Sequence, residues 1–108
     1  MTQPLALEPG KTYFSLFYID EQRRFPIVDT LIYLGQDVIE GERGMVPGHL
    51  FQYAASYHSD GNWNEMSDEE REQFDEPPVI AFDDAHQEAV MDAEGLVSAL
   101  GDWRERTR

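Results

Sequence analysis

Residues 12–19 of this 108-residue chain form an aromatic and β-branched run, and no other segment limits the possible folds as strongly. The run, TYFSLFYI, is apolar on both alternating faces, as expected of a central strand. A polar stretch at 20–24 predicts a turn, and residues 25–34 alternate as a second strand. Together these segments predict an antiparallel hairpin.

Three more strands are predicted farther along the chain. Residues 35–48 contain four glycines and Pro47 with little periodicity, so we expect a long loop there. Short strands at 79–82 and 87–91 flank residues 83–86, a gap of the right size for a hairpin turn. Residues 50–57 resume a strand pattern, whose buried side would hold Phe51, Tyr53, Ala55 and Tyr57.

Two helices carry their own start signals. Ser67 and Glu70 have the spacing of a capping box, in which each side chain accepts a hydrogen bond from the other residue's backbone amide. That helix should end near Phe74, before the prolines at 77–78. Asp92 should cap a final helix, whose apolar stripe would be Leu96, Val97, Leu100 and Trp103.

This order of elements predicts one α+β domain over residues 1–108. We expect a small antiparallel sheet of about five strands, with a short acidic helix and a C-terminal helix packed on one face.

Acidic side chains are concentrated in one third of the chain. Between Asp60 and Glu94 thirteen carboxylates stand against a single base, Arg71, so this segment holds −12 of the formal −14 charge at pH 7. Residues 1–59 sum to −3, and the last fourteen residues sum to +1. Adaptation to high salt would spread acids over the whole surface, so the clustering favours a functional face.

Composition limits the partners and the compartment. The chain has no cysteine, which excludes disulfides, thiolate metal sites and cysteine nucleophiles. Its N-terminus lacks the basic start and apolar stretch of a signal peptide, so we expect a cytoplasmic protein. Direct binding to nucleic acid or to an anionic membrane is not expected, because both carry the same sign of charge as the chain. A partner selected by electrostatics should be basic.

A hydrolase reading of Ser56, His58 and Asp60 is weak. On a strand Ser56 and His58 would lie roughly 7 Å apart, too far for direct proton transfer. No glycine-flanked serine elbow accompanies them. We therefore predict no catalytic residue and no enzymatic activity.

The segment that begins at Asp60 does not match a calcium-binding loop at two essential positions. Asp60, Asn62 and Asn64 match positions one, three and five, but Glu65 replaces the glycine of position six and Arg71 the glutamate of position twelve. The three histidines have no metal-site spacing. We predict no specific metal site and no cofactor, and weak binding of divalent ions through carboxylate density is left open.

The acidic segment is the predicted functional surface. Its cap and its apolar residues predict that it is folded rather than a tail. Like charges held within a Debye length of about 8 Å repel, which costs stability that solubility alone does not require. The predicted partner-binding residues are Asp60, Trp63, Glu65, Asp68, Glu69, Glu72, Phe74, Asp75, Glu76, Asp83 and Asp84, with Tyr57, Trp63 and Phe74 as aromatic anchors.

These features predict a non-enzymatic inhibitor that covers the nucleic-acid-binding site of a nuclease or a defence complex. Two settings fit: a phage anti-defence protein that imitates DNA phosphates, of the anti-restriction or anti-CRISPR kind, and an immunity protein against a nuclease toxin. The alternative is an accessory module that binds a protein through an apolar sheet edge or dimerises, with acidity serving solubility. The sequence leaves the oligomeric state open.

Overall fold

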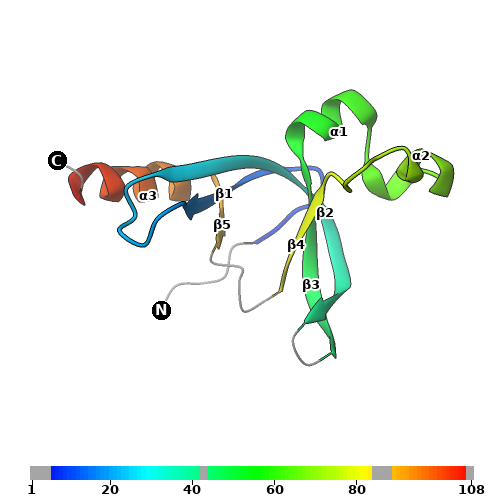
Figure 1. Ribbon diagram of the computed structural model, residues 1–108, viewed down its shortest axis with the longest axis horizontal. Coiled ribbons are helices and arrows are strands. Elements are labelled where there is room, and N and C mark those ends of the chain that lie inside the picture. Colours follow the sequence, from blue (N-terminus) through cyan, green and yellow to red (C-terminus); the bar gives the residue numbers. More distant parts are fainter. Residues whose placement is uncertain (1–5, 42–43, 84–88, 107–108) are drawn as a thin grey trace.

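A five-stranded antiparallel sheet organises the protein (Figure 1). The computed structural model describes residues 6–41, 44–83 and 89–106. Strand order is β4-β3-β2-β1-β5, and every pairing is antiparallel. The architecture is α+β, as predicted. The elements are β1 (Thr12–Tyr18), β2 (Pro26–Gly41), β3 (Gly44–Tyr53), α1 (Ala54–Asp60), the 3-10 turn η1 (Trp63–Glu65), α2 (Asp68–Glu72), β4 (Val79–Asp83), β5 (Val90–Met91) and α3 (Ala93–Arg106).

The first hairpin forms where the sequence predicts it. β1 pairs with the start of β2 in unbroken register, from Thr12↔Ile32 to Tyr18↔Pro26. Asp20 closes the turn, because its Oδ1 accepts hydrogen bonds from the backbone N–H groups of Arg24 at 2.8 Å and Phe25 at 3.3 Å. Its Oδ2 accepts from Arg24 Nε at 2.9 Å, and this bond is the main reason that the pKa of Asp20 is lowered.

The long loop predicted at 35–48 is wrong, because most of this segment extends β2 and β3 into a second hairpin. The pairing shifts register between Tyr33 and Gly35, where Gly35 has a φ of +136° that suits glycine. Gly48 is needed for close packing, since a Cβ there would lie 2.7 Å from Ile39 Cδ1. Two of the four glycines that indicated a loop therefore serve other roles, Gly35 at a bulge and Gly48 at a tight strand contact.

The strand predicted over 50–57 ends early. β3 stops at Tyr53, and residues 54–60 form helix α1 instead. Two alanines begin this helix, and the Ser59 hydroxyl donates to the Ala55 carbonyl at 2.9 Å, a bond between successive helical turns. Of the predicted buried side only Phe51 is buried, whereas Tyr53 is 36% exposed.

The short strands β4 and β5 lie at opposite edges of the sheet. β4 pairs with β3, and β5 pairs with β1 through Phe14↔Met91 and Ser15↔Val90. The hairpin predicted around residues 83–86 is therefore wrong, because the two strands never pair with each other. Residues 84–88 lie outside the described part of the chain.

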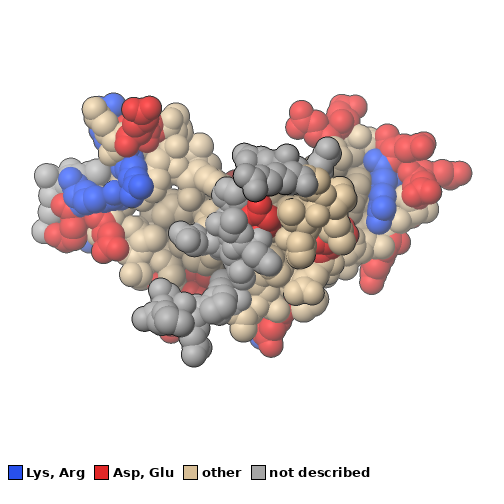
Figure 2. Space-filling model, turned by 90° about the horizontal axis from the view of Figure 1, so that it is seen from below, with Lys and Arg blue, Asp and Glu red and all other residues tan. Residues whose placement is uncertain are grey.

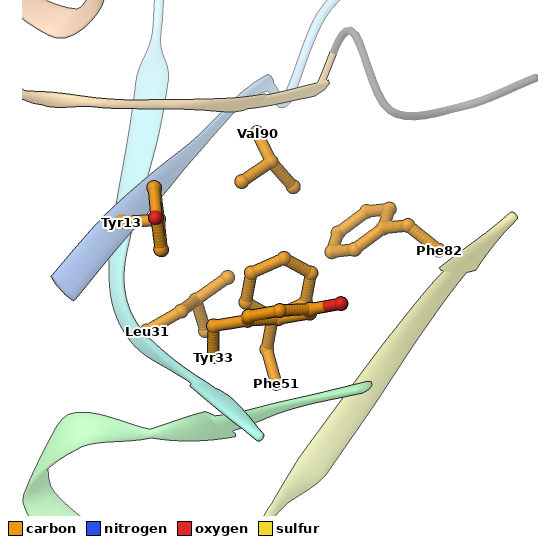
Figure 3. Packing of buried hydrophobic residues seen from close by; sticks show 6 residues of the cluster. All are labelled: Tyr13, Leu31, Tyr33, Phe51, Phe82 and Val90. Atoms are coloured by element: carbon orange, nitrogen blue, oxygen red, sulfur yellow. The ribbon is translucent and has the colours of Figure 1, made fainter. Parts of the chain in front are cut away.

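The core lies on one face of a curled sheet and is rich in aromatic rings (Figure 3). Phe51 and Leu31 are 0% exposed, and the Phe51 ring contacts Tyr33 at 5.1 Å and Phe82 at 5.8 Å between centroids. Phe17 of β1 also stacks on Phe82 of β4 at 6.3 Å, although two strands separate them in the sheet order. Each strand therefore contributes to a core inside the curl, whose members are Tyr13, Leu31, Tyr33, Phe51, Phe82 and Val90.

The helices lie on the other face and at two ends of the molecule (Figure 1). Arg106 of α3 donates to the Tyr18 hydroxyl at 3.2 Å, while Gln52 contacts the segment that follows α1. By strand alternation Tyr18 and Gln52 share the face opposite Tyr13 and Leu31. None of the helices in the described ranges is long and apolar enough to cross a membrane.

Helix α3 begins as predicted, and three of the four residues of its predicted apolar stripe are partly buried. Asp92 caps it, since its Oδ1 accepts from the Gly95 amide at 2.8 Å. Leu96, Leu100 and Trp103 are partly buried, but Val97 is 72% exposed, so its place in the predicted apolar stripe is wrong. The molecule measures 49 × 31 × 25 Å.

Candidate functional site

Eight of the thirteen clustered carboxylates lie on one folded unit, residues 54–78 between β3 and β4, which we call the acidic lobe. It contains α1, η1 and α2 and a single base, Arg71, so its formal charge is −7. Figure 2 shows acidic side chains gathered over the end of the molecule that holds this lobe. All eight carboxylate residues are exposed: Asp60, Glu65, Asp68, Glu69, Glu70, Glu72, Asp75 and Glu76.

Gln52 attaches the lobe to the sheet. Its side chain is 0% exposed at the end of β3, and its Nε2 donates to Ser56 Oγ at 3.1 Å and to the Gly61 carbonyl at 2.9 Å. Its Oε1 accepts from the Trp63 amide at 2.9 Å. One buried amide therefore satisfies backbone groups on both sides of the turn that follows α1, which fixes this turn against the sheet.

Helix α2 is held by the capping box that the sequence predicts. Ser67 Oγ accepts from the Glu70 amide at 3.2 Å, and Glu70 Oε1 accepts from the Ser67 amide at 3.3 Å. The first turn holds three carboxylates, which the positive end of the helix dipole favours. The helix spans only five residues, so it depends on this cap and on packing within the lobe.

The Arg71 side chain bonds to Trp63 within the lobe and is partly buried. Its Nε and one terminal nitrogen donate to the Trp63 carbonyl at 3.2 and 2.9 Å, and its guanidinium lies 5.1 Å from the Trp63 ring centre. The Phe74 ring meets Trp63 edge to face at 5.7 Å. Trp63, Arg71 and Phe74 thus form the small partly buried centre of the lobe.

The lobe carboxylates keep their charge directed to solvent. Within the described ranges no lysine or arginine forms a salt bridge with any of the eight. Asp60 accepts a hydrogen bond from Ser56 Oγ at 3.1 Å, and Glu70 serves the cap. The other six carboxylates are presented on a scaffold whose hydrogen bonds do not use them, so the lobe is a strongly negative surface of fixed shape.

Nine of the eleven predicted partner-binding residues come together on this lobe. Asp83 does not, because β4 leaves the lobe at Val79 and Asp83 lies four residues farther on, about 13 Å along an extended strand. It is partly buried and pairs with Gly48 in the register. Asp84 lies outside the described residues.

The aromatic anchors are partly engaged within the lobe. Trp63 and Phe74 contact each other, and the Tyr57 ring meets the His58 ring edge to face at 6.3 Å. Each of the three anchors is half-buried. Their role toward a partner stays a prediction, whereas their structural role is visible.

Two residues that position the lobe were not among the predicted site residues. Gln52 interrupts the apolar stretch Leu50–Tyr53, and a polar side chain in a buried strand indicates internal hydrogen bonds. Arg71 is the only base among thirteen acids, and its backbone partner eight residues earlier could not be read from spacing. The role of Gln52 could therefore have been inferred from the sequence, whereas that of Arg71 could not.

The weak catalytic and metal motifs gain no geometric support. Ser56 and His58 lie on α1 rather than on a strand, and the Ser56 hydroxyl bonds to Gln52 and Asp60 while His58 is exposed. Among the residues that the structure describes, no three His, Asp or Glu side chains lie close enough together to hold a metal ion.

No family model, curated protein or solved structure matches this chain. The geometry and charge of the acidic lobe are therefore what carry a functional conclusion.

Proposed function

We propose that this protein is a non-enzymatic inhibitor whose acidic lobe docks onto a basic protein surface, one that otherwise binds nucleic acid. The observation that carries the proposal is the display of eight exposed carboxylates on one ordered unit whose only base, Arg71, is partly buried and bonded to the Trp63 carbonyl. A surface that binds phosphates through Lys and Arg is complementary to such a display.

The order of the lobe favours specific recognition over mere solubility. Gln52, the Ser67–Glu70 cap and the Trp63–Arg71–Phe74 centre hold the lobe in one shape. A carboxylate display that is fixed before binding loses less entropy on docking than a flexible acidic tail. Its field also speeds association with a basic partner.

Two biological roles fit this proposal equally well. An anti-defence protein and a toxin immunity protein would both cover a nucleic-acid-binding groove, and both would exclude the nucleic acid from it. The lobe supports the shared chemistry, and the identity of the captured partner separates the two.

Capture on immobilised protein tests the proposal. A nuclease-treated lysate of the source cells is passed over wild type, over Glu69→Lys with Glu72→Lys, and over Asp37→Lys with Asp102→Lys. The two double variants change the net charge equally, and all four positions are exposed, but only the first pair lies on the lobe. We expect wild type and the control pair to retain the same basic protein.

The lobe variant should lose that retention, with affinity falling at least a hundredfold, because each close interfacial charge pair contributes about 1.5 kcal/mol or more. Added double-stranded DNA should displace the captured protein. Equal retention on all three columns, or retention that DNA does not disturb, would overturn the proposal.

A further inference from the structure

Four large apolar side chains are exposed together at the end of the β1–β2 hairpin. Phe17 pairs with Ile27 across the two strands, and the Ile19 amide donates to the Phe25 carbonyl at 3.1 Å as the ladder continues. Alternation places both pairs on one face of the hairpin. We call this surface the tip patch: Phe17, Ile19, Phe25 and Ile27, which are 40%, 70%, 54% and 44% exposed.

The tip patch continues the core, and no helix in the described part of the chain covers it. The Phe17 ring stacks on Phe82, so the patch begins where the core ends. Helix α3 packs on the opposite face, where Arg106 bonds to the Tyr18 hydroxyl and lies 5.6 Å from the Tyr18 ring centre. An open hollow of about 560 Å³, lined in part by Phe17, Tyr18 and Ala89, lies beside the patch.

The tip is electrically neutral, in contrast to the rest of the molecule. Residues 17–27 and 102–106 contain four acids and four arginines, which sum to zero, while the whole chain carries −14. Figure 2 shows basic and acidic side chains side by side at this end, far from the acidic lobe. Two copies of so acidic a protein can approach each other here with the least repulsion.

We propose that the tip patch is the interface of a homodimer, in which a second copy packs its own tip patch against the first around a two-fold axis. A two-fold contact places the same surface against itself, which suits a patch with equal numbers of both charges at its rim. Glu21 and Arg23 lie in the turn between the paired strands and can pair across such a contact. The hollow provides room for a side chain of the second copy.

The area available fits a dimer of moderate affinity. Scaled from the size of buried aromatic side chains, the four exposed side chains leave about 400 Å² of apolar surface, as large as the largest patch on a typical monomer. Two such patches remove about 800 Å², and a rim of turn and α3 residues brings the total toward the lower limit of specific interfaces. We expect a dissociation constant in the micromolar range.

Sedimentation velocity over micromolar to submillimolar concentration tests this dimer. The test variant is Ile19→Ser with Phe25→Ser, and the control is Val38→Ser with Met45→Ser. The control removes two apolar side chains from the β2–β3 hairpin, Val38 at 59% and Met45 at 64% exposed, which is comparable to the exposure of Ile19 and Phe25. Wild type and control should dimerise alike, and the test variant should dimerise at least tenfold more weakly.

Ile19→Asp is a second test variant, since it leaves Phe25 and the Arg24 guanidinium over its ring unchanged. It should weaken the dimer by a similar factor, because it places two carboxylates near the two-fold axis. The lobe variant, Glu69→Lys with Glu72→Lys, should leave the dimer intact. The dimer is therefore tested separately from partner binding through the acidic lobe. A wild type that stays monomeric throughout, or a dimer that only the control variant disrupts, would overturn the proposal.

Discussion

Ser15 is a residue that the fold keeps at a cost in stability. It lies 0% exposed on β1, between the cross-strand neighbours Asp29 and Val90, and its hydroxyl has no hydrogen-bond partner among the residues that the structure describes. A buried hydroxyl without a partner is destabilising, because it loses its bonds to water and gains none.

Ser15→Ala should therefore raise the free energy of unfolding by about 1 kcal/mol, measured by urea denaturation. Ser56→Ala is the control and should lower it, because the Ser56 hydroxyl bonds to both Gln52 and Asp60. A Ser15→Ala protein less stable than wild type would show that the hydroxyl has a stabilising contact.

The Asp20 carboxylate should make the stability of the fold depend on pH. In the folded state the Arg24 side chain lowers the pKa of Asp20 below its ordinary value of 3.8. Since the folded-state pKa lies below the unfolded-state value, the stabilisation is fully present above the unfolded-state pKa and is lost as pH falls through the folded-state pKa. Asp20→Asn removes this contribution at every pH.

The difference in melting temperature between wild type and Asp20→Asn should thus be largest near neutral pH and should shrink as pH falls below about 4. Thermal unfolding followed by circular dichroism at several pH values measures it. A difference that grows on acidification would contradict the role of the Asp20 carboxylate in closing the turn.

At the scale of elements, local signals predicted what local contacts determine. β1, β4 and the starts of α2 and α3 follow the predicted positions, because alternation and side-chain caps act within a few residues. The five-stranded antiparallel sheet with a short acidic helix and a C-terminal helix is also as predicted.

The elements that sequence reasoning missed depend on partners far along the chain. Residues 35–48 look like a loop locally, and they become strands because β2 and β3 pair along their whole length. Residues 54–57 fit a strand pattern locally, but they form a helix, and Gln52 bonds to Ser56 within α1 and to Gly61 after it. The β4–β5 hairpin was wrong since the sheet places these strands on opposite edges.

The candidate site was predictable in composition but not in its internal order. The sequence indicated the carboxylates and the cap, and nine of the predicted residues do lie together. It could not indicate that Asp83 leaves the group along β4, or that Arg71 bonds to the Trp63 carbonyl.

Gln52 provides the test of how the lobe is attached. Gln52→Leu leaves the Trp63 amide and the Gly61 carbonyl without their partner, so we expect about 2–4 kcal/mol of destabilisation. Hydrogen exchange should show the largest loss of protection over residues 61–72. Gln36→Leu, at an exposed position on β2, is the control and should change stability by less than about 0.5 kcal/mol. Uniform loss of protection across the sheet would contradict a local attachment.

At the scale of the whole molecule, charge and apolar surface are separated along an extended body. The radius of gyration is 15.3 Å, larger than the roughly 13 Å of a compact domain of this length. The long axis of 49 Å is several Debye lengths, so the lobe and the neutral tip act independently at physiological salt. A dimer through the tip would present two acidic lobes in opposite directions, which gives one assembly two binding faces.

The most direct measurement is the association rate between this protein and its captured partner as a function of salt concentration. We predict that the rate for wild type falls at least tenfold from low salt to well above physiological salt, because the field of the lobe steers the encounter. Glu69→Lys with Glu72→Lys, which changes the charge of the lobe from −7 to −3, should associate more slowly at low salt and depend less steeply on salt. A wild-type rate that salt does not change, or one equal to that of the lobe variant, would contradict binding through the acidic lobe.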